Sequence, residues 1–423
     1  MKDENLSNKI NKKRQYTMSC QYTDRAASFE VEKIKFIFFL LVISIIQVGV
    51  HPVWSAEAPK KRNLPKVYLN KNGISASGEC GKCHKDIYAT WKNSLHSQVK
   101  GNAVFWTAYL QAYYDDAEKA QELCLSCHSP VAIINKDLML TKKISGEGVN
   151  CDFCHSISGV QKIRSQFEYE HKFGLLKQGP LKDLESPVHE TKFNKLFKQS
   201  QLCAKCHEYE SDNGLKIIET YSEWEQGPYS KKGTHCQDCH MRKVKGKIVA
   251  TEIAVTPEKK ISSHDIAGGH SLAMRDKSLD VQISSIDRIK QKLVVNVDVI
   301  NKGVGHKIPT GLPSKKLTLK VVAQSSSGSI YKTKKKVYQK KLVDRNGDPV
   351  VKDSDLMLGK AVRIVSDNRI SPKETRREEF TFFLPEEDSV KISATVFYSH
   401  NPEIVEEVPI NIKMNEVSKW TGE

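Results

Sequence analysis

Five short segments of the sequence place two cysteines and a histidine at one fixed spacing, C-x-x-C-H. Two thiols three positions apart reach the two vinyl groups on one edge of a porphyrin, and the next residue is then positioned to bind the iron. We number these motifs one to five in chain order; they are Cys80, Cys83 and His84; Cys124, Cys127 and His128; Cys151, Cys154 and His155; Cys203, Cys206 and His207; Cys236, Cys239 and His240. Ten of the eleven cysteines are used in this way, and the other is Cys20. The spacing predicts covalent attachment of c-type haem.

Other uses of paired cysteines explain this pattern less well. A zinc ribbon needs two C-x-x-C pairs and does not require a following histidine. A thioredoxin-like dithiol occurs once in a chain, and disulfides do not explain five repeats that all end in histidine. One such motif arises by chance in roughly one chain in a hundred of this length. The sequence therefore predicts five haems, with thioethers on the ten motif cysteines and the five motif histidines as iron ligands.

The ligand on the other side of each iron decides between two kinds of function. An iron with two histidines has no free position and only transfers electrons, whereas an open iron binds small molecules such as nitrite, hydroxylamine, nitric oxide or peroxide. After residue 55, eight histidines lie outside the motifs. The five that we favour as iron ligands are His96, His189, His235, His264 and His306. His270 and His171 are the alternatives, and His400 is expected in a turn. Five candidates for five irons favour electron transfer; if one of them fails, an open iron results.

The first 55 residues are predicted to be a signal peptide, or alternatively an N-terminal membrane anchor. Lys33 and Lys35 precede the apolar run at 36–50, which is short for a membrane span of about 20 residues. The remainder is then exported, to the periplasm or an equivalent compartment, and only this segment offers membrane association. From residue 56 onward, 58 Lys and Arg outnumber 45 Asp and Glu. We expect redox partner proteins and no nucleic acid. The lysine-rich stretch at 331–336 is expected to be a solvated strand face or loop; the alternative is a docking patch for an acidic face of a partner.

Two halves of the exported chain differ in pattern. Residues 56–275 hold the motifs and show helical periodicity at 86–100 and 103–122, but no strand pattern and too few aliphatic residues for a core without cofactor. Residues 276–415 alternate apolar and polar positions at 292–300, 317–323, 380–384 and 390–398, with turn signals at 326–328 and 346–347. This pattern predicts an immunoglobulin-like β-sandwich of about seven strands, followed by a tail at 416–423. The fold class is α + β in separate domains.

Several segments around the motifs resemble one class of multihaem cytochromes. Trp91, Ser94 and His96 form a W-x-x-S-x-H element after motif one; similar elements are the Ser186–His189 segment, Thr234 with His235, and Ser263 with His264. Together they resemble the class that includes the tetrahaem electron acceptor of hydroxylamine oxidoreductase. The resemblance covers about residues 78–272 and implies electron transfer. It also implies that His96, close to His84 in sequence, serves a haem other than the first.

A glycine-rich loop at 301–311, with His306 in its middle, resembles a loop of multihaem cytochromes that carry an appended β-domain. It implies that His306 joins the two domains through iron. The pentahaem nitrite reductases, more distant members, have lysine instead of histidine in one motif, and no motif here does. This departure disfavours catalysis. We therefore predict an electron relay through bis-histidine haems; the alternative is an oxidoreductase that acts on a small nitrogen or sulfur oxyanion at one five-coordinate haem.

Overall fold

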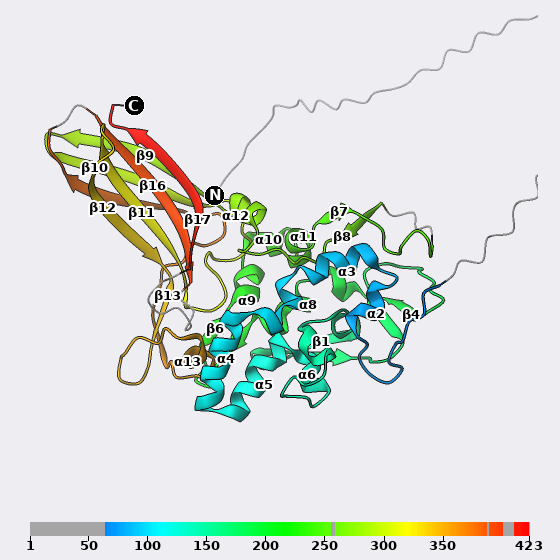
Figure 1. The fold of residues 1–423 in the computed structure, drawn as a ribbon. Coiled ribbons are helices and arrows are strands. Elements are labelled where there is room, and N and C mark those ends of the chain that lie inside the picture. The colour runs from blue at the N-terminus through cyan, green and yellow to red at the C-terminus, as the bar shows by residue number, and fades with distance from the viewer. Residues whose placement is uncertain (1–63, 255–258, 387–388, 401–409, 423) are drawn as a thin grey trace, which may run out of the picture. The chain divides into compact units, whose positions relative to one another are not determined.

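The computed structural model describes residues 64–254, 259–386, 389–400 and 410–422, and all five motifs lie within them (Figure 1). The predicted signal segment at 1–55 and Cys20 lie outside the described residues. In these ranges, no helix is both long enough and apolar enough to cross a membrane. The described part of the chain belongs to one unit, Arg62–Glu423.

Each motif begins, forms or ends a helix. Both cysteines of a motif are three residues apart, so one helical turn presents them on the same face. Motif one joins α2 (Ser77–Gly81) to α3 (Lys85–Lys92), motif two ends α5 (Ala117–His128), motif three is α7 (Cys151–His155), motif four ends α8 (Gln201–His207) and motif five is α11 (Cys236–His240). Side chains cap some of these helices; the Asn150 side chain, for example, accepts a hydrogen bond from the Phe153 N–H at 2.8 Å.

The remaining helices are short, except for α4. They are η1 (Leu95–Ser97), η2 (Val99–Gly101), α4 (Ala103–Asp115), α6 (Pro130–Ile134), η3 (Ile144–Glu147), η4 (Lys195–Lys198), α9 (Thr220–Glu225), α10 (Pro228–Lys231), α12 (Leu272–Ser278) and α13 (Asp353–Met357). The helix predicted at 86–100 ends at Lys92. The helix predicted at 103–122 is two helices, because the Asp116 side chain accepts a hydrogen bond from the Lys119 N–H and begins a new one.

Four two-stranded sheets interrupt the helical part, where the sequence predicted no strands. The pairs are β1 (Ile157–Ile163) with β2 (Gln166–His171), β3 (Leu176–Gly179) with β4 (Glu190–Phe193), β5 (Tyr209–Glu210) with β6 (Lys216–Ile218), and β7 (Lys243–Lys245) with β8 (Lys260–Ser262). That prediction was wrong because these strands have two to seven residues, too few for a clear alternation. Two of the pairs bring histidines into position, as described below.

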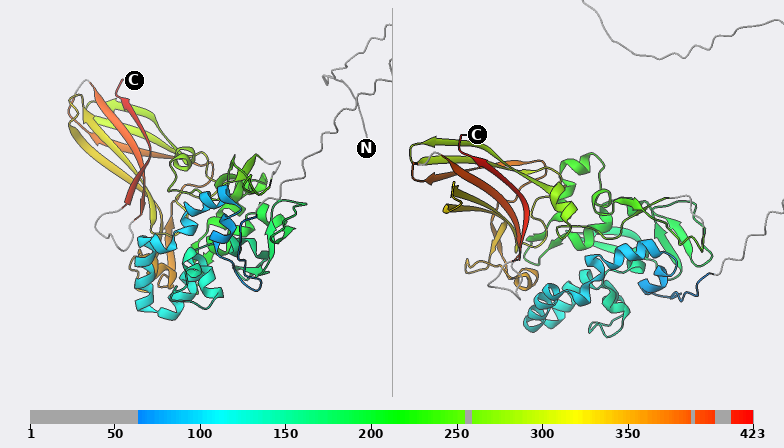
Figure 2. Two further views of the ribbon diagram at one scale, coloured as in Figure 1. Left: turned by 45° about the vertical axis from the view of Figure 1, so that its right-hand side comes forward. Right: turned by 45° about the horizontal axis from the view of Figure 1, so that its top comes forward.

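The C-terminal part consists of seven longer strands in two sheets around one apolar core, which side chains such as Val297, Leu319 and Val396 fill. The three-stranded sheet has the order β15 (Thr375–Phe383), β10 (Lys292–Asn301), β9 (Leu279–Ile289); the four-stranded sheet has the order β12 (Ile330–Tyr338), β11 (Lys315–Ser325), β16 (Val390–His400), β17 (Ile410–Trp420). A further pair, β13 (Lys340–Val343) and β14 (Arg363–Asp367), stands apart from them. Figure 2 shows the seven strands from two more sides.

The α + β class and the four strands predicted from alternation are confirmed. The sheets are small and open, and the immunoglobulin-like assignment stays a prediction. The predicted tail at 416–423 needs correction, since β17 continues to Trp420 and pairs with β16 along its length. The predicted border at 275/276 also shifts slightly, because α12 ends at Ser278 and β9 begins at the next residue.

Candidate haem centres

Four of the five motif histidines each face a histidine from elsewhere in the chain. The ring centroids are separated by 6.2 Å for His84 and His189, 6.5 Å for His155 and His264, 6.3 Å for His207 and His96, and 6.5 Å for His240 and His306. A bond between a metal and an imidazole nitrogen is about 2.0–2.1 Å long. Two such bonds, with the distance from each nitrogen to its own ring centre, add up to roughly 6.3 Å. The spacing of all four pairs therefore fits one iron atom between the rings.

Hydrogen bonds fix the orientation of six of these eight rings. In each, Nδ1 lies close to a backbone carbonyl oxygen: Ile248 for His84, Gln178 for His155 and Ala267 for His240, all at 2.6 Å; Ser262 for His264 and Lys307 for His306, both at 2.8 Å; and Glu190 for His189 at 3.1 Å. Because a carbonyl only accepts, Nδ1 carries the proton and donates it. Nε2 is left with its lone pair, as an iron ligand requires.

Burial favours the neutral form of several of these imidazoles by lowering the pKa. Loss of hydration lowers the pKa of His207 to about 3 and those of His264 and His306 to about 4. It also lowers the pKa values of His96 and His155. A neutral imidazole is the form that binds a metal. The donor chemistry of the four pairs thus fits bis-histidine haem iron, and the neighbouring motif cysteines supply the attachment points.

The W-x-x-S-x-H element brings His96 to motif four. The Trp91 indole N–H donates to the Val149 carbonyl at 2.9 Å, and the Val149 N–H donates to the His96 carbonyl at 2.8 Å. The residue before Val149 is Gly148, which has a φ of +72°. A Cβ at this position would be 2.2 Å from the His96 carbonyl oxygen. The tryptophan thus holds the segment and the glycine lets the two backbones approach.

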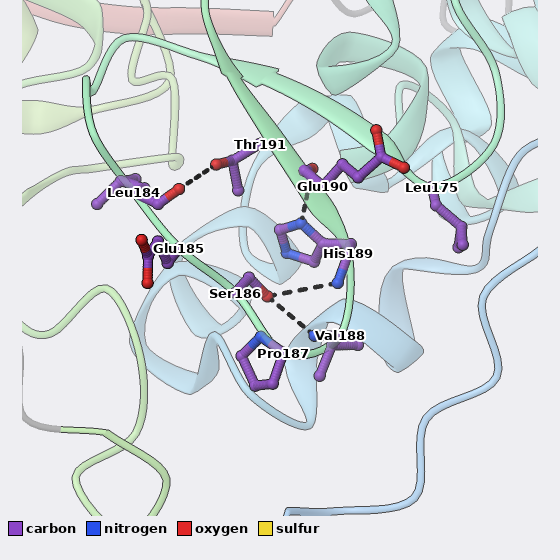
Figure 3. A pocket seen from close by; sticks show the side chains of 9 residues that line it. All are labelled: Leu175, Leu184, Glu185, Ser186, Pro187, Val188, His189, Glu190 and Thr191. Carbon is purple, nitrogen blue, oxygen red and sulfur yellow. Dashed lines mark hydrogen bonds between the residues drawn. The ribbon is translucent and has the colours of Figure 1, made fainter.

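A turn after β3 presents His189 to motif one (Figure 3). The Ser186 hydroxyl oxygen accepts hydrogen bonds from the N–H groups of Val188, at 3.2 Å, and His189, at 3.4 Å. The parallel pairing of β3 with β4 closes the segment at its base. An open pocket of about 520 Å³, lined by Leu175 and residues 184–191, lies at this turn. His189 is one of the residues that line it.

The β7–β8 hairpin presents His264 to motif three. β7 follows motif five directly, and β8 ends two residues before the histidine. The His264 N–H donates to Thr90 Oγ1 on α3 at 3.1 Å. A histidine close in sequence to motif five therefore serves motif three, which sequence distance alone does not indicate.

The loop at 301–311 carries His306 from the β-sheet part to motif five. One carboxylate oxygen of Glu223, on α9, accepts hydrogen bonds from the Lys307 N–H at 3.1 Å and from Thr310 Oγ1 at 2.9 Å. The Asn301 side-chain amide donates to the His306 carbonyl at 3.2 Å. Arg369 lies 2.6 Å from the second oxygen of Glu223. The two halves of the molecule thus meet around this loop through buried charges and a facing histidine pair.

His235 does not face any motif histidine and leaves the predicted set of iron ligands. It precedes α11, its Nδ1 lies 3.3 Å from both the N and Oγ of Ser200, and its ring packs on Trp224 at 5.4 Å. The reason is its position: a residue that adjoins Cys236 is committed to the start of the motif helix. His171 is hydrogen-bonded to Ser156 at 2.8 Å, and His400 Nε2 lies 3.2 Å from Asp353. Neither these nor His270 replaces it.

Motif two is consequently different from the other four. Within the described ranges, no histidine ring faces His128, and the only histidine outside them is His51 in the predicted signal segment. The ring that His128 contacts is Phe105, with centroids 4.4 Å apart, too close for a metal atom between them. Burial lowers the pKa of His128 to about 4. Among the described residues, the arrangement therefore offers one imidazole, that of His128, to an iron at motif two.

Contacts between cysteines show which motifs are neighbours. Cys80 lies next to Cys151, Cys127 next to Cys206, and Cys203 next to Cys236. Motif one thus adjoins motif three, and motif four adjoins both motif two and motif five. Cys154 of motif three acts electrostatically on both cysteines of motif four. Motif four is therefore the central one.

Comparison with known proteins finds one family and one similar fold. Residues 79–156 match the family described as cytochrome c554 and c-prime. The crystal structure of a penta-haem cytochrome c552 from Thermochromatium tepidum is similar, with a TM-score of 0.66 and 22% identity over 82% of this chain and 99% of that one. No curated protein matches.

Two further solved structures overlap only weakly. The match to a β-galactosidase from Bacteroides fragilis (TM-score 0.19, 12% identity) covers 36% of this chain and 16% of the galactosidase chain. The match to a CARDB domain from Pyrococcus furiosus (TM-score 0.17, 16% identity) covers 34% of this chain and 87% of that domain's chain. The resemblance predicted from the sequence is confirmed at two levels: residues 79–156 match the cytochrome c554 and c-prime family, and the fold of the chain is similar to that of a penta-haem cytochrome c.

Proposed function

We propose that this chain is an exported pentahaem cytochrome that relays electrons between redox partner proteins, with four irons held between two histidines each. Bound c-type haem supplies a reversible one-electron change at iron. The observation that carries the proposal is the set of four facing histidine pairs, each with a spacing that fits one iron. An iron with both axial positions filled by protein leaves no place for a substrate, so transfer of electrons is its remaining use.

The chain's residues support a relay in two ways. The hydrogen bonds from Nδ1 to backbone carbonyls hold the imidazoles in one orientation in both redox states, which keeps the structural change on electron transfer small. The cysteine contacts place neighbouring motifs side by side in the order one, three, four, with two and five next to four. Electrons can then pass in short steps, with motif four as the branch point.

The remaining parts of the proposal concern export and the β-sheet part. Lys33 and Lys35 before the apolar run at 36–50 support a signal peptide, and thioether attachment of haem suits an extracytoplasmic protein. The two sheets around one core support a sandwich of the immunoglobulin-like kind. Its role here is to supply His306 and a surface for partner proteins.

A second function is favoured by one specific observation. His128 faces no other histidine within the described ranges and packs on Phe105 instead. If the iron of motif two has an open position, the alternative predicted from the sequence applies to this centre alone. It would then act on a small nitrogen or sulfur oxyanion, with electrons supplied through motif four.

Electron paramagnetic resonance of the oxidised protein tests both parts. We expect low-spin signals from four irons and a high-spin signal from one, and carbon monoxide binding to one haem in five after reduction. His306→Ala is the calibrating variant. It should convert the motif-five iron to high spin and so add a second high-spin signal. Uniformly low-spin iron in the unmodified protein would exclude the second function. High-spin signals from several irons would contradict the histidine pairs and, with them, the pure relay.

A further inference from the structure

Three polar residues of the β-sheet part lie at one end of the four-stranded sheet. Lys315 begins β11 and His400 ends β16, and the two are directly paired in the antiparallel register. Asp353 begins α13, and its Oδ2 lies 3.2 Å from His400 Nε2. The Asp353 and His400 side chains are 11% and 14% exposed, so the pair is largely removed from water.

This cluster lies beside the His128 centre. The Lys315 ammonium and the Asp353 carboxylate both act electrostatically on the His128 ring, in opposite directions. α13 also packs against α4, the helix that carries Phe105. The packing of α13 on α4 thus places the Asp353–His400 pair near the helices around motif two, and Lys315 lies near His128 and near His207 of motif four.

Further contacts anchor α13 and the residues after it to the helices around motif two. Lys360 forms an ion pair with Asp115 at 2.6 Å, and Lys119 Nζ donates to the Leu358 carbonyl at 3.2 Å. The Tyr209 hydroxyl, two residues after motif four, donates to the Met357 carbonyl at 3.1 Å. These contacts hold the C-terminal end of α13 and the residues after it against the helices around motif two.

Two groups of the cluster lack a protein partner within the described ranges. Asp353 Oδ1 is buried and has no hydrogen bond. Lys315 is half-buried, and its ammonium is in neither a salt bridge nor a hydrogen bond with the residues that the structure describes. Buried polar groups are nearly always hydrogen-bonded, and leaving them unpaired costs free energy. Both a cation and an acceptor are thus available for a molecule that the chain itself does not supply.

We propose that Lys315, Asp353 and His400 form a binding site for the anion of a small weak acid at the His128 centre. The Lys315 ammonium binds the negative charge, and the free oxygen of Asp353 is an acceptor for an N–H or O–H group where the ligand has one. The hydrogen bond between His400 and Asp353 holds that carboxylate in place. The inference rests on the open iron position of the proposed second function, and it assigns the recognition of the ligand to the β-sheet part.

Azide binding to the oxidised, haem-loaded, full-length protein tests this proposal. Azide is a small weak-acid anion, and its binding converts a high-spin iron to low spin, so the dissociation constant follows from spectra without any turnover. Lys315→Met should weaken azide binding about tenfold or more, since it removes a charge-assisted contact. Lys315→Arg should retain most of the azide affinity of the unmodified protein. Carbon monoxide, which is neutral, should bind the reduced variant as it binds the unmodified protein.

Lys316→Met is the matched control. Lys316 is the next residue along β11 and points to the opposite face of the strand, so the same change in net charge should leave azide affinity unaltered. Equal loss in both variants would mean that only the overall charge matters and would overturn the site.

The outcomes separate this inference from the function on which it depends. If the unmodified protein has no high-spin iron and binds no carbon monoxide, the open position itself is excluded. If the iron is open but Lys315→Met binds azide normally, the inference alone is wrong, and Lys315 neutralises a haem propionate instead. If Lys315→Met creates a high-spin signal that the unmodified protein lacks, Lys315 is itself an iron ligand, which also overturns the anion site.

Discussion

The sequence predicts the motif histidines more completely than the histidines outside the motifs. The motif histidines follow from covalent spacing alone, which is a local property. The other ligands depend on which segments fold against each other: His264 follows motif five but faces motif three, and His96 follows motif one but faces motif four. The sequence identified four residues that face motif histidines, without their partners. It missed that His235 is held by Ser200, because that contact joins residues 35 positions apart.

A substitution at Gly148 tests whether His96 binds the motif-four iron, and it leaves every proposed iron ligand unchanged. A methyl group at this position would meet the His96 carbonyl oxygen at 2.2 Å, and φ +72° is itself unfavourable for alanine. We expect Gly148→Ala to displace the His96 segment and to convert the motif-four iron partly or fully to high spin. Gly179→Ala is the control, since nothing lies within 4 Å of its added methyl group. Unchanged low-spin spectra in Gly148→Ala would show that His96 is not the ligand of motif four.

Among the strands, the long ones were predicted from the sequence and the short ones were not. The strands at 292–300 and 390–398 are long enough for alternation to be unambiguous, and both were found. The two- to seven-residue strands around the motifs were not, although β3–β4 and β7–β8 are what position His189 and His264. Such short strands form because neighbouring segments and the cofactor constrain the chain, and local sequence contains little of that information.

One buried ion cluster joins the helical elements to the β-sheet elements, and its centre is Arg369, 3% exposed. Its guanidinium contacts Glu223 at 2.6 Å, Asp367 at 2.8 Å and Glu219 at 3.0 Å. Arg369→Ala leaves three carboxylates near one another with less positive charge. We expect the free energy of unfolding of the haem-loaded protein to fall by about 3–5 kcal/mol, the range for breaking a buried ion pair.

Denaturant unfolding measures this change, and Arg376→Ala provides the comparison. Arg376 pairs with Glu374 at 2.5 Å near the surface, where both side chains are about 30% exposed. Its loss should cost at most about 1 kcal/mol. If Arg369→Ala costs no more than Arg376→Ala, the cluster does not hold the two halves together.

For the whole molecule, the cofactor count and the processing of the N-terminus are tested by one mass measurement. We expect the mature chain to begin near residue 56 and to exceed the mass of its polypeptide by five haem groups, which survive denaturation because thioethers are covalent. Iron analysis should give five atoms per chain. Retention of the first 55 residues would favour the membrane anchor, and four haems would show that one C-x-x-C-H motif is unused.

The charge of the whole molecule bears on its partners. Lys320 on β11 lies directly opposite Lys335 on β12, an arrangement that destabilises a sheet. Lys332 and Lys335 on the same edge strand are both exposed. A repulsive pair of this kind is useful where an acidic surface docks, since the partner then neutralises both charges. We therefore expect this edge of the four-stranded sheet to receive an acidic redox partner.

Stopped-flow reduction of the oxidised protein by a small acidic flavoprotein tests this surface. We expect the rate constant to fall as ionic strength rises, because salt screens the attraction. At low salt, Lys335→Glu should slow the reaction about three- to tenfold. Lys292→Glu changes the net charge equally but lies on β10 in the other sheet, and it should have a smaller effect. If both variants slow the reaction alike, the attraction comes from the total charge, and docking at this edge is excluded.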